Sequence, residues 1–401
     1  MAALLSSDSL VIRGARVALD AAHAELLDLE IRDGRIDALR PAAAGRGSQI
    51  IDLSGRFILP GLINAHDHLE FNLFPRLGNG PYPNAGAWAQ DIYHPDAPPV
   101  REHLTVPKPS RLIWGGLKNL LSGVTCVCHH NPVDDHVFDE SYPVRVLKRF
   151  GWAHSLEFCP DLAGRSGQTP AGWPFILHLG EATDEAGTQE IHHLAQAGAL
   201  DSRTVLIHAV ALDRAGFELA RARGASIVWC PSSNIFVLGR TVAGFVLQSS
   251  VAVALGSDSA LTGCGDLLDE LRFARQTGSV PDESLYGMVT KHAARVLRLP
   301  PGSGVITEGG YADLMALPGR ASTPAAALLD AWRTGPELVM VGGQVRLISE
   351  ALDFHPPGVF HRLHLEGRQP VRVRADLPDL LQATTTALGG NLRLAGKRVL
   401  S

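Results

Sequence analysis

The chain has 401 residues, of which 45% are hydrophobic and 19% are charged, and its formal net charge is −5. This composition excludes a disordered chain, and the length indicates one large domain with a smaller one. The chain has no basic block of the kind that binds nucleic acid, and no apolar run reaches the roughly 18 residues of a membrane span. The N-terminus lacks the pattern of a signal peptide, and the five cysteines lie mostly inside apolar runs, so we expect a reduced, cytoplasmic protein.

Both ends of the chain show a β-pattern. Apolar and charged residues alternate from Leu27 to Arg32, ahead of Asp33-Gly34, which is a strong two-residue hairpin signal. A second hairpin signal, Gly342-Gly343, lies between two apolar segments near the other end. The expected domains are a composite β-sandwich from residues 1–56 and 301–350, a barrel at 57–300, and a C-terminal extension at 351–401 to which the sequence assigns no role.

The middle of the chain alternates short apolar runs with helical patterns, which predicts parallel βα units. Several runs end in a polar residue, as in a TIM-like (β/α) barrel, whose active site lies at the carboxyl ends of the strands. Only about 15 residues separate the third expected strand from the fourth, so one strand is short or one βα unit is altered. The seven expected strands are 57–65, 124–129, 152–158, 174–179, 204–209, 225–230 and 251–257.

A long segment rich in proline, glycine and aromatic residues, 71–109, follows the first of these strands. Loops of this length inside a compact domain are commonly functional, and in a barrel this loop would lie over the mouth of the active site. We expect it to form part of the substrate wall. Trp88 could offer a stacking face to a flat ring, and packing of the loop on itself is the alternative.

Four residues at the ends of apolar runs suit a metal ion. His66 and His68 stand two residues apart at the end of the first run, so they share one face of a strand. His178 and Asp258 also end apolar runs. Three imidazoles and a carboxylate suit one catalytic divalent metal, which lowers the pKa of a bound water. Asp258 could also hold the attacking water and take its proton.

Further candidates accompany these ligands. Glu181 follows His178 by three residues, and we expect it to carry a proton from water to a substrate nitrogen; a solvated glutamate at a helix start is the alternative. His208 ends another apolar run and is expected to orient water or substrate rather than bind the metal. Glu70 and His130 are weaker candidates for substrate contacts, since a loop carboxylate and a structural histidine would show the same patterns.

The motifs together resemble the amidohydrolase superfamily, in its metal-dependent deaminase and chlorohydrolase branch, to which cytosine deaminase belongs. The motifs that carry the resemblance are Pro60–His68, Gly123–Thr125, His178–Glu181, His208, Cys230–Asn234 and Gly256–Ser259. The resemblance implies one Zn²⁺ or Fe²⁺ ion, a proton-carrying glutamate and an orienting histidine. Another branch holds two metals with a lysine at a strand end, and none is seen here. The implied ligands are His66, His68, His178 and Asp258, with Glu181 as proton carrier and His208 as orienting residue.

The sequence therefore predicts a metal-dependent hydrolase of a C–N bond, with deamination of an aminated heterocycle or a cyclic amidine as the leading reaction. Hydrolysis of an amide or cyclic amide, and displacement of chloride, stay open because the same ligands serve all of them. A non-catalytic scaffold of the same fold would be expected to have lost ligands. We expect a small-molecule substrate, no nucleic-acid or membrane partner, and a homodimer.

Overall fold

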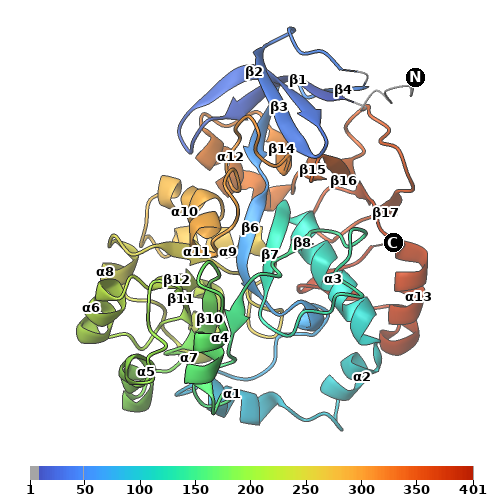
Figure 1. The fold of residues 1–401 in the computed structure, drawn as a ribbon. Coiled ribbons are helices and arrows are strands. Elements are labelled where there is room, and N and C mark those ends of the chain that lie inside the picture. The colour runs from blue at the N-terminus through green and yellow to red at the C-terminus, as the bar shows by residue number, and fades with distance from the viewer. Residues whose placement is uncertain (1–8, 48, 401) are drawn as a thin grey trace, which may run out of the picture.

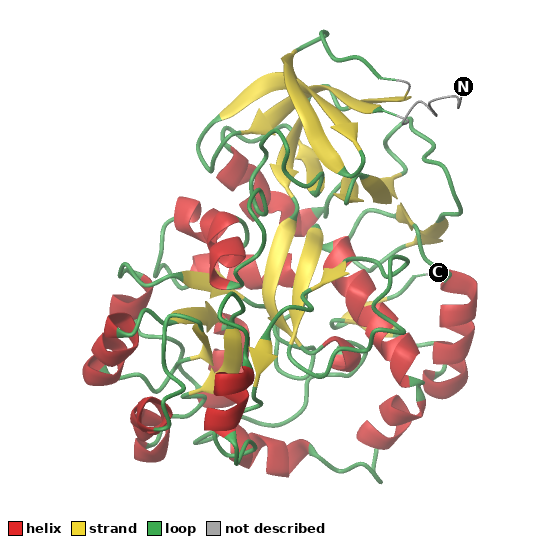
Figure 2. Cartoon of the chain, in the orientation of Figure 1, coloured by secondary structure: helices red, strands yellow, loops and turns green. Residues whose placement is uncertain are grey.

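The computed structural model of the protein describes residues 9–47 and 49–400. A β-rich part lies at the top of Figure 1, and a larger part of strands and helices lies below it, as the colours of Figure 2 make clear. The N-terminal segment 1–8, for which the sequence predicts no signal peptide, lies outside the described residues. Within the described residues, no helix is both long and apolar enough to span a membrane.

Both ends of the chain contribute to one ten-stranded sheet. Strand β5 joins the two ends, since it pairs in parallel with β1 and antiparallel with β14. The predicted hairpin turn Asp33-Gly34 connects two of its strands, and both residues have the positive φ that such turns require, 49° and 77°. The strands are β1 (Leu10–Ala18), β2 (Ala24–Arg32), β3 (Arg35–Pro41), β4 (Gln49–Asp52), β5 (Arg56–Pro60), β14 (Leu314–Pro318), β15 (Leu338–Val341), β16 (Gln344–Ser349), β17 (His361–Leu363) and β18 (Val371–Val373).

This sheet has a hydrophobic core of its own. Buried side chains from its two halves, among them Ile12, Leu29, Ile58 and Leu338, form one cluster that is separate from the clusters of the barrel. The two chain ends therefore build one small β-structure, as the sequence predicts. Its arrangement as a two-layered sandwich and the domain boundaries at 56 and 300 stay predictions.

Within the described residues the barrel has eight short strands, one more than the seven that the sequence shows, and the sequence leaves open that one strand is too short to be recognised. The run 57–65 divides at Gly61 into β5, which belongs to the small sheet, and a barrel strand. An additional strand of two residues, β8, is too short to give a sequence pattern. The barrel strands are β6 (Leu62–Asp67), β7 (Val124–His129), β8 (Arg145–Val146), β9 (Gly151–Trp152), β10 (Phe175–Leu179), β11 (Thr204–His208), β12 (Ser226–Trp229) and β13 (Val253–Leu255).

These strands form two parallel sheets, in the orders β6-β7-β8 and β13-β12-β11-β10-β9. No helix follows β7 or β8: the loop 130–144 connects them, and only residues 147–150 separate β8 from β9. The altered units therefore lie between residues 130 and 150, not in the stretch between 158 and 174 where the sequence suggests one. The short connection from β9 to β10 still holds a helix, of seven residues, whose first turn the Asp161 side chain caps through the Gly164 N–H.

Helices cover the outside of the barrel (Figure 1). The segment 71–109, expected to be a loop, holds two short helices, and a 3-10 turn at Leu69–Phe71 precedes it. The long helix α3 buries Leu112, Trp114 and Leu117 against the strands. The helices are α1 (Ala85–Ile92), α2 (Val100–Thr105), α3 (Lys108–Leu121), α4 (Leu162–Gln168), α5 (Glu185–Gln196), α6 (Arg214–Ala222), α7 (Pro231–Leu238), α8 (Gly244–Leu247), α9 (Leu267–Gln276), α10 (Asp282–Met288), α11 (Lys291–Val296), α12 (Pro324–Asp330) and α13 (Leu377–Leu388).

Alternation along the barrel strands delivers polar residues to the interior. Ile176 belongs to the core inside the barrel, while Phe175 and Leu177 pack outward against the helices. The next inward position on this strand is His178. Along the last strand, Ala254 faces the same interior core, and the same parity leads to Asp258. The alternation of side chains along these two strands thus brings His178 and Asp258 to the same end of the barrel.

The C-terminal extension packs against the barrel. Strands β17 and β18 join the small sheet, and β19 (Arg393–Leu394) pairs with β20 (Lys397–Arg398). Arg368 and Lys397 form ion pairs with the buried Asp266, at 2.8 and 3.0 Å, and Asp266 caps the N-terminus of α9. The extension is therefore held by buried charge pairs as well as by apolar contacts.

We expect Lys397→Met to lower the free energy of unfolding near neutral pH by about 2–4 kcal/mol, because it leaves a buried carboxylate short of a partner. Burial alone would raise the pKa of Asp266, but Arg368 and Lys397 hold it below the ordinary value of 3.8. A carboxyl with a depressed pKa contributes its stability above pH 3.8 and loses it as the pH falls toward the folded-state pKa.

The difference in stability between wild type and variant should therefore be largest above about pH 5 and shrink below about pH 4. Urea unfolding at a series of pH values measures it. Arg398→Met, on the same strand and exposed, is the matched control and should change little. A difference that stays constant from neutral to acid pH would show that the ion pair is not its source.

Candidate metal centre and active site

The structure brings all four predicted metal ligands together at one end of the barrel. His66 lies at the end of β6, and its Nε2 atom is 3.4 Å from Nε2 of His178 and 3.7 Å from Oδ1 of Asp258. Two overlapping groups have ligand atoms within 4.8 Å of one another: His66 with His68 and Asp258, and His66 with His178 and His208. His208, expected only to orient water or substrate, therefore lies within the same cluster.

Neighbouring groups fix which ring nitrogen of two histidines carries the proton. Nδ1 of His178 lies 2.8 Å from the backbone oxygen of His154, and Nδ1 of His208 lies 2.8 Å from Oδ1 of Asn234. Because both partners can only accept, each Nδ1 donates and each Nε2 keeps a lone pair. Metal-binding histidines characteristically have their second nitrogen held in this way.

The chemistry of the cluster fits a divalent cation. Burial, followed by the neighbouring imidazoles, lowers the pKa of His66 and of His178 well below the ordinary value, so both rings are neutral. His66 also has a buried Nδ1 atom without a hydrogen-bond partner. Nitrogen lone pairs that converge at 3.4 Å beside a carboxylate repel one another unless a proton or a cation lies between them. Imidazole nitrogen and carboxylate oxygen are the ligands that Zn²⁺ and Fe²⁺ accept.

Asp258 is prepared as a carboxylate. Its Oδ1 atom accepts from the backbone N–H of Ser259 at 2.7 Å, and its Oδ2 atom accepts from the hydroxyls of Ser233 and Thr262 at 2.8 and 2.9 Å. Burial alone would raise the pKa of Asp258, but nearby His68 and His208 and the hydrogen bond from Ser233 lower it. The side chain is therefore ionised near neutral pH.

Two residues of the cluster have a strained backbone. Asp258 and His208 have φ angles of 53° and 70°, in the left-handed region that non-glycine residues rarely adopt. On β11, Val205 and Ile207 face the barrel interior, so simple alternation would point His208 outward. The left-handed turn at His208 accompanies a ring that instead stacks on His178, with centroids 5.3 Å apart. Strain of this kind is commonly found at functional sites.

Glu181 lies beside the cluster as a candidate proton carrier. Its Oε2 atom is 3.6 Å from Nε2 of His208, and its side chain is 15% exposed. Burial raises the pKa of Glu181 to about 7. A carboxyl group with a pKa near neutrality can both take and give a proton at the pH of the reaction.

A cavity of about 1000 Å³ opens above these residues. His68, His178, His208, Asp258 and Glu181 lie on its lining, together with two of the predicted substrate contacts, Glu70 and Trp88. His130 is not part of this lining. It is fully buried behind His178, with ring centroids 4.2 Å apart, and its Nε2 donates to the backbone oxygen of Ala153. The sequence places His130 at a strand end, but its ring packs against the rings of His178 and Trp152 and does not line the cavity.

Helix α1 and the residue before it form one wall of the cavity, from Asn84 to Gln90. Backbone hydrogen bonds attach this wall to the site. The Ala85 N–H donates to the backbone carbonyl oxygen of Glu181 at 3.0 Å, and the Thr183 N–H donates to the backbone carbonyl oxygen of Pro83 at 2.7 Å. Trp88 lines the cavity and also donates its indole N–H to the backbone oxygen of Leu77. The aromatic side chain therefore faces the cavity and holds its own loop.

Sequence reasoning missed several residues of the lining. His154 follows the two-residue strand β9, and burial, with a contribution from His68, lowers its pKa to about 4. Its position inside the expected strand 152–158 concealed that the strand ends at Trp152. Glu157 and Glu190 also line the cavity, and Asn131 donates to Oε1 of Glu70 at 2.8 Å. Their sequence neighbourhoods contain no signal that distinguishes them from loop and surface residues.

Comparisons with known proteins agree with this geometry. The model of the amidohydrolase family matches residues 174–346. The 5-methylthioadenosine/S-adenosylhomocysteine deaminase of Syntrophobacter fumaroxidans is 26% identical over 351 residues, which cover 71% of this chain and 78% of that protein. A triazine hydrolase variant has a similar fold, with a TM-score of 0.73 at 19% identity over 95% of this chain and 99% of its own.

An adenosine deaminase from Xanthomonas campestris, crystallised with bound zinc, has a TM-score of 0.69 at 18% identity and covers 94% of this chain and 97% of its own. The match of residues 174–346 to the amidohydrolase family and the similarity to these deaminases agree with the resemblance that the motifs carry. They confirm the prediction of a hydrolase that acts on C–N bonds.

Proposed function

We propose that the protein is a zinc-dependent deaminase that replaces the exocyclic amino group of an adenine nucleoside with oxygen and releases ammonia. The observation that carries the proposal is the position of Glu181, a largely buried carboxyl with a pKa of about 7 that borders both the metal cluster and the cavity. The curated relative named above is a deaminase of 5-methylthioadenosine and S-adenosylhomocysteine, and a structural neighbour is an adenosine deaminase.

The residues of the site divide the work of hydrolysis. A divalent ion held by His66, His68, His178 and Asp258 supplies Lewis acidity, which makes water a stronger acid. Glu181 takes one proton from the attacking water and passes it to the ring nitrogen beside the carbon that is attacked, where it stays in the product. The second proton of the water goes to the amino group, which leaves as ammonia, so the C–O bond forms, the C–N bond breaks, and both protons of the water are used.

His208 and Asp258 orient the reacting groups. His208 is fixed by Asn234, and its Nε2 lone pair faces Glu181 and the cluster. It therefore accepts a hydrogen bond from water or from the protonated Glu181. Asp258 stays ionised through its three hydrogen bonds and can accept the second proton of the water.

The cavity favours a nucleoside over a bare ring. Its volume of about 1000 Å³ is at the upper end of the range for small-molecule sites, and a single pyrimidine or triazine would leave most of it empty. Acidic and amide side chains belong to its lining, including Asn84, Glu157 and Glu190. Such acceptors suit the hydroxyl groups of a ribose and the substituent at its 5′ position.

Glu70 is the proposed contact for substrate hydroxyls. Asn131 donates to its Oε1 atom, while its buried Oε2 lies 3.6 Å from Nε2 of the buried His129 and makes no hydrogen bond among the described residues. We expect Glu70→Gln to raise KM by about 10–100-fold, because a charge-assisted hydrogen bond to the substrate is lost. The kcat of the variant should stay within a few fold of the wild-type value. Steady-state kinetics and metal content measure this, with the exposed Glu102→Gln as control. An unchanged KM would remove Glu70 from substrate binding.

A substrate panel tests the proposed reaction. Ammonia release should be measured with adenosine, 5′-methylthioadenosine and S-adenosylhomocysteine, and with cytosine as a small heterocycle. We expect the adenine nucleosides to give kcat/KM at least about 100-fold above that of cytosine. Chloride release from a chlorotriazine would identify a chlorohydrolase, and ring opening of a cyclic amide would identify an amide hydrolase. A fully metallated protein without any of these activities would favour the alternative of a non-catalytic scaffold with the same fold.

The predicted homodimer and cytoplasmic location are kept as parts of this proposal. The five cysteines are unpaired, which is compatible with a reducing compartment. Light scattering of the purified protein measures the oligomeric state, and a monomer at micromolar concentration would contradict the dimer.

A further inference from the structure

The metal cluster lies at a place where the barrel strands are not joined by a ladder. Among the described strands, β6 pairs with β7 and β13 pairs with β12, but β6 and β13 do not pair with each other. We call this boundary, between Leu62–His68 and Val253–Asp258, the β6–β13 seam. His66 and His68 stand on one side of it and Asp258 on the other, so its width sets the separation of the metal ligands.

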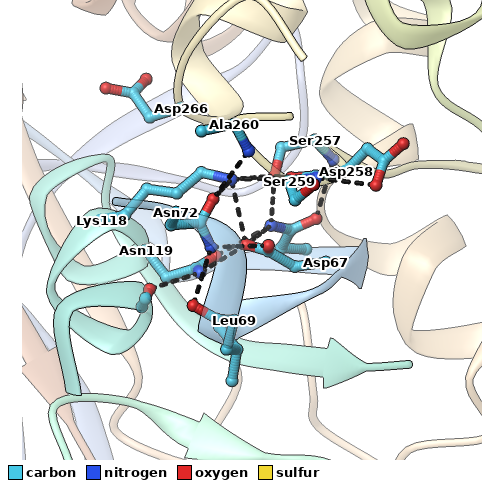
Figure 3. Close-up of polar contacts among 12 residues, drawn as sticks. Asp67, Leu69, Asn72, Lys118, Asn119, Ser257, Asp258, Ser259, Ala260 and Asp266 are labelled. Carbon is cyan, nitrogen blue, oxygen red and sulfur yellow. Dashed lines mark hydrogen bonds and ion pairs between the residues drawn. The ribbon is translucent and has the colours of Figure 1, made fainter. Parts of the chain in front are cut away.

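Lys118, from helix α3, reaches into this seam from outside the barrel (Figure 3). Its side chain is 1% exposed, and its Nζ atom lies 3.1 Å from Oδ2 of Asp67 on the β6 side. On the β13 side, Nζ is 3.0 Å from the hydroxyl of Ser257 and 2.8 Å from the backbone oxygen of Asp258. Asn72 supplies a further acceptor at 2.9 Å. One ammonium group therefore binds both sides of the seam.

Amide side chains complete the network around this ammonium. Asp67 also accepts from Nδ2 of Asn119 at 2.8 Å and from Nδ2 of Asn72 at 2.9 Å. Asn64 crosses the seam, because its Nδ2 donates to the Ser257 hydroxyl at 2.8 Å and its Oδ1 accepts from the Ser257 N–H at 3.1 Å. Side chains thus provide the cross-strand hydrogen bonds that a ladder would otherwise supply.

The network acts on a residue with a strained backbone. Asp258 has a φ of 53°, its N–H donates to the His66 oxygen at 3.1 Å, and its carbonyl oxygen accepts from Lys118. The backbone N–H of Asp258 is therefore held by β6, and its backbone carbonyl oxygen is held by Lys118 of α3. The two sides also approach closely: a Cβ atom on Gly256 would lie 2.7 Å from Cβ of His66.

We propose that Lys118, paired with Asp67, is a positioning residue that fixes Asp258 relative to His66 and His68 and thereby sets the metal affinity of the site. Asp67 stands between the two histidines, so the Asp67–Lys118 pair anchors the strand that carries them. The inference rests on the proposed function only in that these residues bind a metal; it requires no particular substrate. Residues that orient metal ligands typically change metal affinity by about 10–100-fold when they are removed.

Cobalt binding tests the proposal without any substrate. The metal-free wild type, Lys118→Met and Ser257→Ala should be titrated with Co²⁺, and the visible spectrum of each complex recorded. We expect Lys118→Met to weaken Co²⁺ binding by about 10–100-fold and to change the spectrum, because Asp258 is no longer held in place. Ser257→Ala removes one member of the network and should weaken binding by a smaller factor. Lys108→Met, exposed on the same helix, should match wild type.

The unfolding midpoint of each metal-free variant separates positioning from general stability. If Lys118 were merely structural, Lys118→Met would lower this midpoint, yet its folded fraction would bind Co²⁺ with the affinity and spectrum of wild type. That result, or wild-type cobalt binding by Ser257→Ala, would overturn the proposal. Should Lys118→Met fail to fold, Ser257→Ala and the double variant Asp67→Asn/Lys118→Met, which removes both charges together, decide the question. Absence of deaminase activity would contradict the proposed function and leave this result standing.

Discussion

His178→Ala should lose both the metal ion and catalytic activity. Nε2 of His178 converges on Nε2 of His66 at 3.4 Å, and its ring is held by the backbone oxygen of His154. Alanine removes one of the three imidazoles of the predicted ligand set and leaves a gap beside His66. We expect the metal content after dialysis to fall from near one ion per chain to a small fraction, and kcat/KM to fall by at least about 10³-fold.

Elemental analysis and steady-state kinetics of the same preparation measure both effects. His193→Ala, an exposed histidine on α5, is the matched control and should keep the metal and the activity. Circular dichroism of both variants verifies the fold. Wild-type metal content in His178→Ala would show that the cluster binds its ion through the other residues and that His178 has another role.

Glu181→Gln should keep the metal and the fold but lose at least about 10²-fold in kcat, as expected when a general acid–base group is removed. Glutamine has almost the same shape and can still accept a hydrogen bond, but it cannot carry a proton. Because Glu181 is not one of the residues in the ligand groups, metal affinity should be unchanged. The measurement is kcat with the best substrate of the panel, next to metal content.

Glu185→Gln, four residues along the chain and exposed on α5, serves as the control for charge removal near the site. Near-normal turnover of Glu181→Gln would remove Glu181 from the mechanism, and the half-buried Glu190 on the cavity lining would be the next carboxylate to test. Loss of metal from Glu181→Gln would instead show that Glu181 belongs to the metal centre.

The metal cluster could be predicted because its signals are local in sequence. His66 and His68 share a strand face by simple alternation, and His178 and Asp258 each end an apolar run. The carboxyl ends of all strands in a parallel barrel lie at the same end of the barrel. Residues at these strand ends therefore come together even when the positions of the helices are not known. The same logic identified Glu181 and His208, although the left-handed backbone that accompanies the inward position of His208 has no signal in the sequence.

The missed features depend on very short or tertiary structure. Strands β8 and β9 have two residues each, and two residues cannot show a periodic pattern. His154 became visible as a cavity residue only once the end of β9 was known. Lys118 reads as an ordinary helical lysine, and its partner Asp67 lies 51 residues away, so only packing of α3 on the β6–β13 seam reveals the pair.

Metal-dependent hydrolytic release of ammonia is the central property proposed for this protein, and isotope-labelled turnover tests it most directly. Protein stripped of metal, and the same protein restored with Zn²⁺, should be incubated with 5′-methylthioadenosine in water labelled with heavy oxygen. We predict that only the restored protein reacts, with one ammonia released per product and one heavy oxygen atom on the purine ring. Equal reaction without metal, or a product that keeps its amino group, would contradict the account.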